Sequence, residues 1–212
     1  MRRRDEILNV AGALFAANGY ASTSMRDLSQ ATGLLAGSLY THFRSKLEML
    51  DELTSRYFAG LLPQQEAVMM ASASGAARFR TLLHVTVEHT AHHRNELSIL
   101  HYSWAQIRVE PDLAHIRELS RRSMRTWSTV IRAGIEDGSL RSDISVELLT
   151  RMVPGAIHSL LDVQRYPERS AKLRSHTVGE VVKLLEASVL GGLLVDATLP
   201  ELVDVEPAVP VV

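Results

Sequence analysis

The sequence predicts an all-α protein, with a three-helix domain at the N-terminus and a larger helical domain after it. Apolar residues recur three and four positions apart along almost the whole chain, and no stretch alternates apolar and polar residues as a strand would. The length of 212 residues accommodates a small domain over residues 1–50 and a helical domain over 51–199. A tail over 200–212 holds three prolines and little that it can bury, so we expect it to be disordered.

The first predicted helix covers residues 5–18 and ends at Asn18-Gly19, a pair typical of helix C-termini. Its basic start and apolar run superficially resemble a signal peptide. Asp5, Glu6 and Asn9 interrupt that run, and its apolar residues keep helical spacing. We therefore interpret the segment as the first helix of the small domain.

Residues 24–43 predict a helix-turn-helix. Ser24 can cap the first helix through its side-chain oxygen, and Asp27 adds a carboxylate to the first turn. Gly33 can adopt the left-handed conformation that a tight turn requires. The second helix then begins at Ala36, after Leu35, which has no capping side chain. Its expected inward stripe is Leu39, Tyr40 and Phe43.

The outward face of this second helix carries small and polar residues, which would let the helix enter a major groove. The segment Ser45-Lys46-Leu47-Glu48 reads as a capping box, which would point a fourth helix and the Lys46 ammonium toward the same surface. A helix-turn-helix pattern alone also fits a buried helical hairpin. The flanking first and fourth helices favour a complete DNA-binding unit instead.

These residues resemble the TetR family of transcriptional regulators over about the first quarter of the chain. The matching residues are Phe15, Gly19-Tyr20, Thr23-Ser24, Asp27-Leu28, Gly33, Gly37-Ser38-Leu39-Tyr40, His42-Phe43, Ser45-Lys46 and Leu50. The chain departs from the family at Ser29 and Thr32, where Ala is common, and at Leu35, where a Ser cap is common. The resemblance implies a helix-turn-helix DNA-binding domain, a C-terminal domain for ligand binding and dimerisation, and repression of a palindromic operator by a dimer.

Basic residues flank the predicted reading helix. The whole chain has a net charge of −1, but residues 1–56 carry seven basic and six acidic side chains. Arg2–Arg4 are interpreted as a mobile basic arm for the DNA backbone or minor groove, the alternative being a solvated terminus. The residues predicted to bind DNA are Arg4, Thr23, Ser24, Arg26, Ala36, Gly37, Ser38, Tyr40, Thr41, His42 and Lys46.

Helical spacing continues through the rest of the chain, with a small-residue break at Ser72–Gly75. The expected helices run from the box at Ser45 to about Met70 and then over residues 77–93, 97–107, 111–136, 145–164 and 177–194. The last two carry more apolar surface than one buried face needs, which favours a four-helix interface between two copies over a purely intramolecular core. The predicted interface residues are Leu149, Val153, Val181, Leu184, Leu185 and Ser188.

The middle of the chain is expected to bind an effector. Its predicted residues are His101, Trp104, Arg121, Met124, Arg125, Trp127, Ile157, Leu161 and Arg165, each of which also fits a plain core or a solvated face. Apolar residues beside arginines suit an apolar ligand with an anionic head. The chain is also similar to TetR-type regulators of lipid or sterol breakdown, some of which respond to acyl-coenzyme A thioesters. A cationic lipophilic drug is the alternative effector.

Metal and enzyme chemistry find little support. His89, His92 and His93 have the spacing of metal ligands on a helix but lack a fourth ligand, so we interpret them as surface histidines and expect no metal or cofactor. The chain has no cysteine, no Gly-rich phosphate loop, no nucleophile elbow and no His-Glu-x-x-His. The apolar run at 187–195 is too short to span a bilayer. We expect a cytoplasmic, non-enzymatic regulator; a helical enzyme and a dimeric interaction protein without DNA binding are the alternatives.

Overall fold

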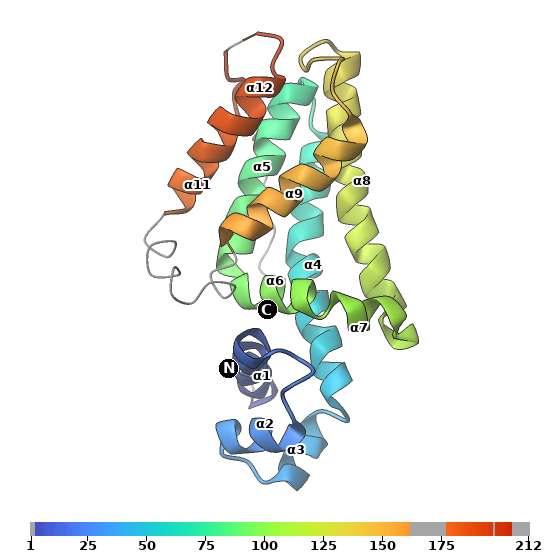
Figure 1. Cartoon of the computed structure of the whole chain (residues 1–212), viewed down its shortest axis with the longest axis vertical. Helices are drawn as coiled ribbons and strands as arrows, with labels where there is room; N and C mark the ends of the chain where they lie inside the picture. Colours follow the sequence, from blue (N-terminus) through green and yellow to red (C-terminus); the bar gives the residue numbers. More distant parts are fainter. Residues whose placement is uncertain (1–2, 162–176, 197, 205–212) are drawn as a thin grey trace. The chain divides into compact units, whose positions relative to one another are not determined.

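A computed structural model describes residues 3–161, 177–196 and 198–204 (Figure 1). Within these ranges the regular structure is helical, apart from one isolated bridge between Leu140 and Leu194. The chain divides into two compact units, the first made of Met1–Phe58 and His93–Glu118 and the second of Ala59–His92 and Leu119–Val212. The units therefore do not coincide with the expected ranges 1–50 and 51–199, because a later segment joins the first unit.

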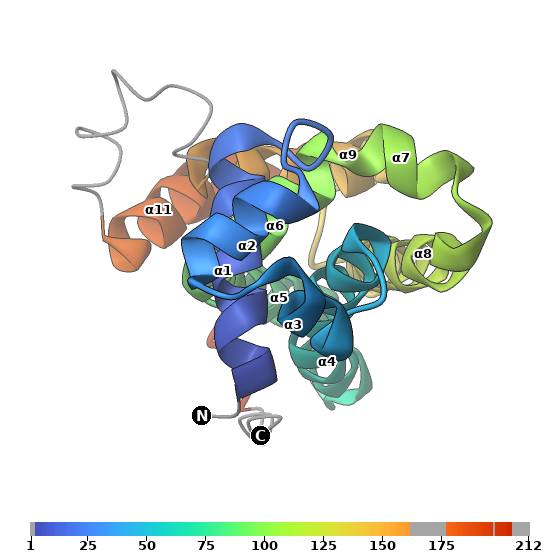
Figure 2. The same ribbon diagram turned by 90° about the horizontal axis from the view of Figure 1, so that it is seen from below.

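The first unit is built around three short helices that Figure 2 shows from below. Its elements are α1 (Arg3–Asn18), α2 (Met25–Thr32), α3 (Ala36–His42), the first part of α4 (Lys46–Met70), α6 (Arg94–Tyr102), α7 (Trp104–Val109), the 3-10 turn Pro111–Leu113 and the start of α8 (Ala114–Glu136). Helix α1 packs against α2 and α6, and α2 packs against α3. The core of the small helices consists of Ile7, Leu8, Phe15, Leu28, Leu39 and Phe43.

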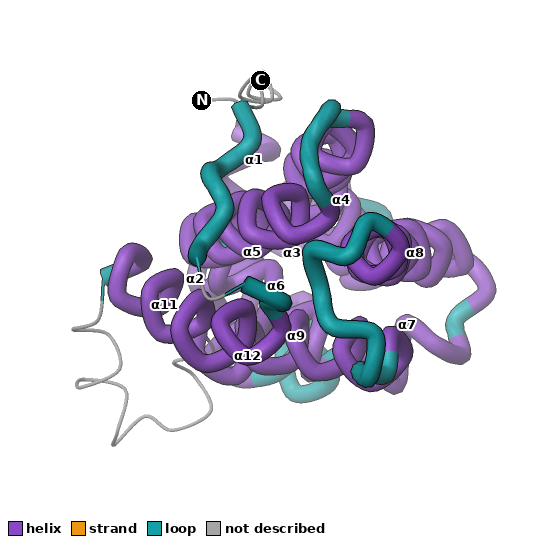
Figure 3. Tube along the Cα trace, turned by 90° about the horizontal axis from the view of Figure 1, so that it is seen from above, coloured by secondary structure: helices purple, strands orange, loops and turns teal. Residues whose placement is uncertain are grey.

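The second unit contains the rest of α4 and α8 together with the later helices, seen from above in Figure 3. These are α5 (Gly75–His92), α9 (Val146–Leu161), α11 (Val178–Leu185), a π-helical turn (Glu186–Leu190) and α12 (Gly191–Leu193). Helix α5 packs against both α9 and α11. None of the helices within the described ranges is long and apolar enough to cross a membrane.

The junction between α5 and α8 requires glycine. A Cβ on Gly75 would lie 2.1 Å from the backbone nitrogen of Gly134, so only glycine permits this approach. The turn after α8 then caps α5, because an Asp137 carboxylate oxygen accepts from the Gly75 amide at 2.6 Å and the Ser139 hydroxyl accepts from the Ala76 amide at 3.0 Å. The predicted helix end at residues 137–138 is confirmed by Gly138, whose φ is 75°.

Several predicted elements differ in the structure. The segment expected as one helix over 97–107 is two, α6 and α7, which meet at Ser103. The expected last helix is interrupted by the π-helical turn, which adds a residue per turn. The expected disordered tail is bound over its described part, because Arg80 donates to the Pro200 carbonyl at 2.6 Å and the Val203 amide donates to Thr81 at 2.7 Å.

Candidate nucleic-acid interface

Helices α2 and α3 form the predicted helix-turn-helix, and the expected caps hold it. The Asp27 amide donates to the Ser24 hydroxyl at 3.2 Å, and the Ser24 amide donates to the Asp27 carboxylate at 2.8 Å. Hydrogen bonds from the hydroxyl and amide of Ser24 lower the pKa of Asp27. Gly33 takes the left-handed conformation with φ 68°, and Ser29 donates to the Leu34 carbonyl at 2.5 Å. These local bonds fix the turn that places α3.

Helix α3 presents a small and polar face to solvent. Leu39 is fully buried, whereas Ala36, Gly37, Ser38 and Thr41 are exposed. Gly37 has a φ outside the left-handed region and no atom within 4 Å of the position that a Cβ would occupy. The fold itself therefore does not require glycine at this position. Because Gly37 has no side chain and its surroundings are open, another molecule can approach the backbone of α3 here.

Tyr40 corrects one part of the predicted pattern. Helical spacing predicts an inward-facing Tyr40, but 52% of the residue is exposed, unlike the buried Leu39 and Phe43. Its hydroxyl is therefore available to a partner. The α3 N-cap, Leu35, is exposed and makes no side-chain cap, as the sequence predicts.

Lys46 makes contacts that differ from its expected phosphate contact. Its Nζ donates to the carbonyl oxygens of Tyr20 at 2.6 Å and Thr23 at 2.7 Å, and it lies 4.3 Å from the centroid of the Tyr20 ring. Burial lowers the pKa of this lysine. The ammonium thus fastens the loop between α1 and α2 to the start of α4, which positions the Ser24 cap.

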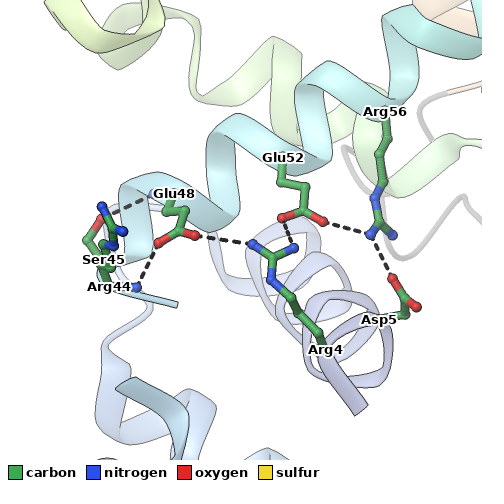
Figure 4. Close-up of polar contacts among 7 residues, drawn as sticks. All are labelled: Arg4, Asp5, Arg44, Ser45, Glu48, Glu52 and Arg56. Carbon is green, nitrogen blue, oxygen red and sulfur yellow. Dashed lines mark hydrogen bonds and ion pairs between the residues drawn. The ribbon is translucent and has the colours of Figure 1, made fainter. Parts of the chain in front are cut away.

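Arg4 likewise belongs to the fold rather than to a mobile arm. Helix α1 already begins at Arg3, and the Arg4 guanidinium pairs with Glu48 at 3.1 Å and with Glu52, both on α4 (Figure 4). Its guanidinium also lies 4.2 Å from the centroid of the Phe43 ring. Arg56 extends the network by binding Glu52 and Asp5, each at 2.7 Å. These ion pairs hold α1 against the N-terminal part of α4.

Thr23 and the predicted capping box also differ from expectation. Thr23 is buried and donates to the Gly19 carbonyl at 2.9 Å, so its side chain is not free for DNA. Ser45 does accept from the Glu48 amide at 3.2 Å, but the Glu48 carboxylate accepts from the amide of Arg44 instead of Ser45. Arg44, another of the basic residues that flank the reading helix, is exposed just after the C-terminal end of α3.

Among the predicted DNA contacts, the side chains that remain outward are those of Arg26, Ala36, Ser38, Tyr40 and Thr41, together with the bare backbone of Gly37. The Thr41 hydroxyl donates to the Ser38 carbonyl at 2.7 Å and keeps its acceptor lone pairs. Ser24 is exposed but engaged with Asp27, and His42 is half-buried.

The predicted effector residues do not gather in one unit. His101 and Trp104 belong to the first unit, whereas Met124 and Trp127 belong to the second. Trp127 is buried and packs edge-on against Phe79, with ring centroids 5.6 Å apart. Trp127 is therefore a core residue, as are Ile157 and Leu161, which are also buried.

The arginines of α8 have separate environments. Arg117 donates to the carbonyls of Ile107 and Glu110, each at 2.8 Å, and thereby caps the C-terminal end of α7. Arg122 pairs with Glu66 at 2.5 Å. Arg121 and Arg125 are exposed in the second unit. Arg165, the remaining predicted effector residue, lies outside the described residues.

The sequence predicts that His89, His92 and His93 all lie at the surface, and for His89 this prediction is wrong. His89 is buried, and a Cβ on Gly60 of α4 would lie 2.6 Å from its ring. His92 is exposed, and its Nδ1 donates to the Glu88 carbonyl at 2.8 Å. Within the described ranges, no three His, Cys, Asp or Glu side chains group as metal ligands would.

The predicted dimer residues divide into buried and exposed sets. Leu149, Val153, Val181 and Leu185 are buried within the chain itself, which corrects their assignment to an intermolecular surface. Leu184 is 53% exposed and Ser188 is also exposed. Sequence reasoning missed two further apolar residues at the surface of α9, Leu148 and Met152, which lie four positions apart and so share a face.

The similarity of the chain to known protein families and to characterised proteins agrees with this architecture. Residues 7–53 match the family described as "Bacterial regulatory proteins, tetR family", and residues 72–162 match "Tetracyclin repressor-like, C-terminal domain". The chain is 32% identical over 151 residues to the "HTH-type transcriptional repressor KstR2" of Mycobacterium tuberculosis, a match that spans 71% of this chain and 76% of that protein. The protein of the same name from Rhodococcus jostii is also 32% identical, over 71% and 74% of the two chains.

A solved structure extends the similarity to most of the fold. The structure described as the ketosteroid transcriptional regulator KstR2 of Mycobacterium tuberculosis superimposes with a TM-score of 0.79 at 27% identity, and covers 92% of this chain and 96% of its own. The predicted all-α fold class, with an N-terminal helix-turn-helix domain followed by a C-terminal helical domain, is thereby confirmed.

Proposed function

Because the chain belongs to the TetR family of bacterial transcriptional regulators, we propose that it is a repressor that binds a palindromic operator as a dimer and releases it when an apolar effector binds. The observation that carries the proposal is the exposed, small-residue face of α3, held by the capped turn before it. Such a face suits insertion into the major groove.

Within this proposal the residues of the first unit have two kinds of role. Ser38 and Thr41 read base edges, and Gly37 permits close approach of the helix backbone. Arg26, Tyr40 and Arg44 contact phosphates, which position the protein without selecting sequence. Lys46 and Arg4 hold the helices in place from behind this surface.

Dimerisation is proposed through the exposed apolar residues of α9 and α11, namely Leu148, Met152 and Leu184. A single α3 reads only one half-site, so specificity for a palindrome requires a second copy related by a two-fold axis. The partners of the chain are then operator DNA, a second copy of itself and a small molecule.

The effector is proposed to be largely apolar with an anionic group, in the manner of an acyl-coenzyme A thioester. Two relatives that share 32% identity are repressors called KstR2, and the related solved structure is described as a ketosteroid regulator. Arg121 and Arg125 are cationic groups of the second unit that could bind the anion. A cationic lipophilic drug is the competing effector class and would be expected to bind acidic rather than basic side chains.

Release follows from the path of α4, which begins in the first unit and continues into the second. The ion pairs of Arg4 and Arg56 tie α1 to α4, so a shift of α4 on effector binding would move the helix-turn-helix with it. Operator and effector must weaken each other's binding by the same factor, because the coupling is thermodynamic.

The test is a gel shift of the purified protein against the promoter DNA next to its own gene, with free acids, their coenzyme A thioesters and cationic dyes added in turn. We expect one retarded complex with the stoichiometry of a dimer. Coenzyme A thioesters should dissociate this complex, and cationic dyes should not. No specific complex at any promoter fragment, with the protein shown to be folded, would refute operator binding; release by dyes alone would refute the anionic class.

A further inference from the structure

One buried amide in the second unit lacks a complete set of hydrogen bonds. Gln65 on α4 is 0% exposed, and its neighbours along the inner face of the helix, Leu61, Leu62 and Val68, are apolar and buried. Its Nε2 donates to the Thr86 hydroxyl on α5 at 3.2 Å, whereas its Oε1 has no hydrogen-bond partner among the described residues. Buried side-chain polar atoms in native proteins are rarely left in this state.

Turning the amide over does not remove the deficit. With the two ends exchanged, Oε1 would accept from Thr86 and Nε2 would lack a partner, because the hydroxyl satisfies one end at a time. A purely structural core position here would be filled better by leucine or methionine, which have no polar atom to desolvate. An incomplete amide in an apolar setting is instead a feature of ligand sites, where a few polar groups orient an otherwise apolar molecule.

The surrounding face of α5 fits a ligand of mixed character. Phe79 and Thr86 are seven residues apart and therefore lie on one side of the helix, and Phe79 contacts Trp127 of α8. All three are buried. The polar pair of Gln65 and Thr86 is thus continuous along α5 with an aromatic, apolar region of the same unit.

We propose that Gln65 and Thr86 form the polar end of the effector site, and that the effector is an apolar molecule carrying a hydroxyl group. In the orientation that the structure shows, Thr86 already satisfies Nε2, so a hydroxyl that donates to Oε1 completes the amide, whereas an ether oxygen has no proton to donate. This inference rests on the proposed function of the second unit as an effector-binding domain. It assigns to the effector a second polar group, separate from the anion that the arginines would bind.

The experiment compares 1-dodecanol with dodecyl methyl ether, which retain the same chain but differ in the hydroxyl donor. Binding is followed by fluorescence in a Trp104→Phe background, which leaves Trp127 as the sole tryptophan of the chain. Operator binding and its release by each probe are measured in parallel by anisotropy. We expect the alcohol to bind about fivefold more tightly than the ether, the size of one net hydrogen bond.

Gln65→Met removes the amide at nearly constant length and Thr86→Val removes the hydroxyl at constant shape. Each should abolish the preference for the alcohol, and Gln65→Met should leave the ligand-free protein at least as stable as the wild type. Gln64→Met is the matched control, since Gln64 is only half-buried and donates to the Gly60 carbonyl at 2.9 Å.

Equal binding of alcohol and ether in the wild type would overturn the inference, as would an undiminished preference in Gln65→Met or no binding of either probe. These results differ from a failure of the proposed function. If both probes bind equally and release the operator, effector-controlled repression stands without Gln65. If the alcohol preference depends on Gln65 but the operator is never bound or released, the site stands and the proposed repression fails.

Discussion

Replacing Gly37 by alanine separates the stability of α3 from its use as a DNA-reading surface. The added methyl group would meet no atom within 4 Å, and the φ of Gly37 is not positive. The substitution therefore introduces neither a clash nor backbone strain. Alanine is a better helix former than glycine by about 0.5–1 kcal/mol, so the free energy of unfolding should rise by up to that amount.

For a chain of this length, that gain corresponds to an increase in Tm of about 1–4 °C. Binding to DNA should change in the opposite direction, because a methyl group would stand between the α3 backbone and the groove. We expect a loss of about tenfold or more in operator affinity, equivalent to about 1.4 kcal/mol. Thermal unfolding and fluorescence anisotropy with labelled operator measure the two effects on the same sample.

Gly179→Ala is the matched control, since Gly179 is an exposed glycine in the first turn of α11 with no close neighbour. Its operator affinity should equal that of the wild type. An unchanged affinity in Gly37→Ala would refute the assignment of this face of α3 to DNA. A lower Tm in Gly37→Ala would refute the structural reasoning, because no contact of the fold would then explain the loss.

Three other substitutions test the site and the assembly. Lys46→Met should lower stability and operator affinity without changing the slope of log affinity against log salt concentration, because the Lys46 ammonium binds carbonyls. A slope reduced in magnitude by about one would instead show that Lys46 contacts a phosphate. Leu184→Arg should give a folded monomer by light scattering, whereas Leu185→Arg should unfold the chain, since Leu184 is 53% exposed and Leu185 is 3% exposed; dimeric Leu184→Arg would rule out the proposed interface. Asp137→Asn should lower the free energy of unfolding measured in urea at neutral pH. Burial is the largest single influence and raises the pKa of Asp137, but the hydrogen bonds from Ser139 and the Gly75 amide together outweigh it and lower the pKa overall. The stability advantage of the wild type over Asp137→Asn should therefore persist above about pH 4 and vanish as the pH falls further; a stability difference independent of pH would contradict the role of the charge.

The sequence alone determined the two helices of the helix-turn-helix, α2 and α3, and where each begins. The Ser24–Asp27 box, the left-handed Gly33 and the uncapped start of α3 at Ala36 all depend on residues within four positions of one another. Such features are readable from the chain because the atoms that bond are brought together by the helix itself. The family resemblance depended on the same short segment.

Only the tertiary structure decided where the long side chains of this segment are used. The sequence predicts that Lys46 and Arg4 bind DNA phosphates. In the structure Lys46 instead binds carbonyls 23 and 26 residues earlier in the chain, and Arg4 binds carboxylates 44 and 48 residues later. The sequence contains the charges on both sides of each contact. It does not indicate which groups meet, because that depends on how α1 and α4 pack.

The sequence also did not determine which side of the last helices faces the core. Val181, Leu184 and Leu185 are apolar on more than one side of α11, so periodicity gives no single inward direction. Packing on α5 buries Leu185 and leaves Leu184 at the surface, about 100° around the helix. Likewise, a glutamine within an apolar helix looks ordinary until the neighbours of Gln65 are known, because an unsatisfied hydrogen bond is a property of the space around a residue and not of the residue itself.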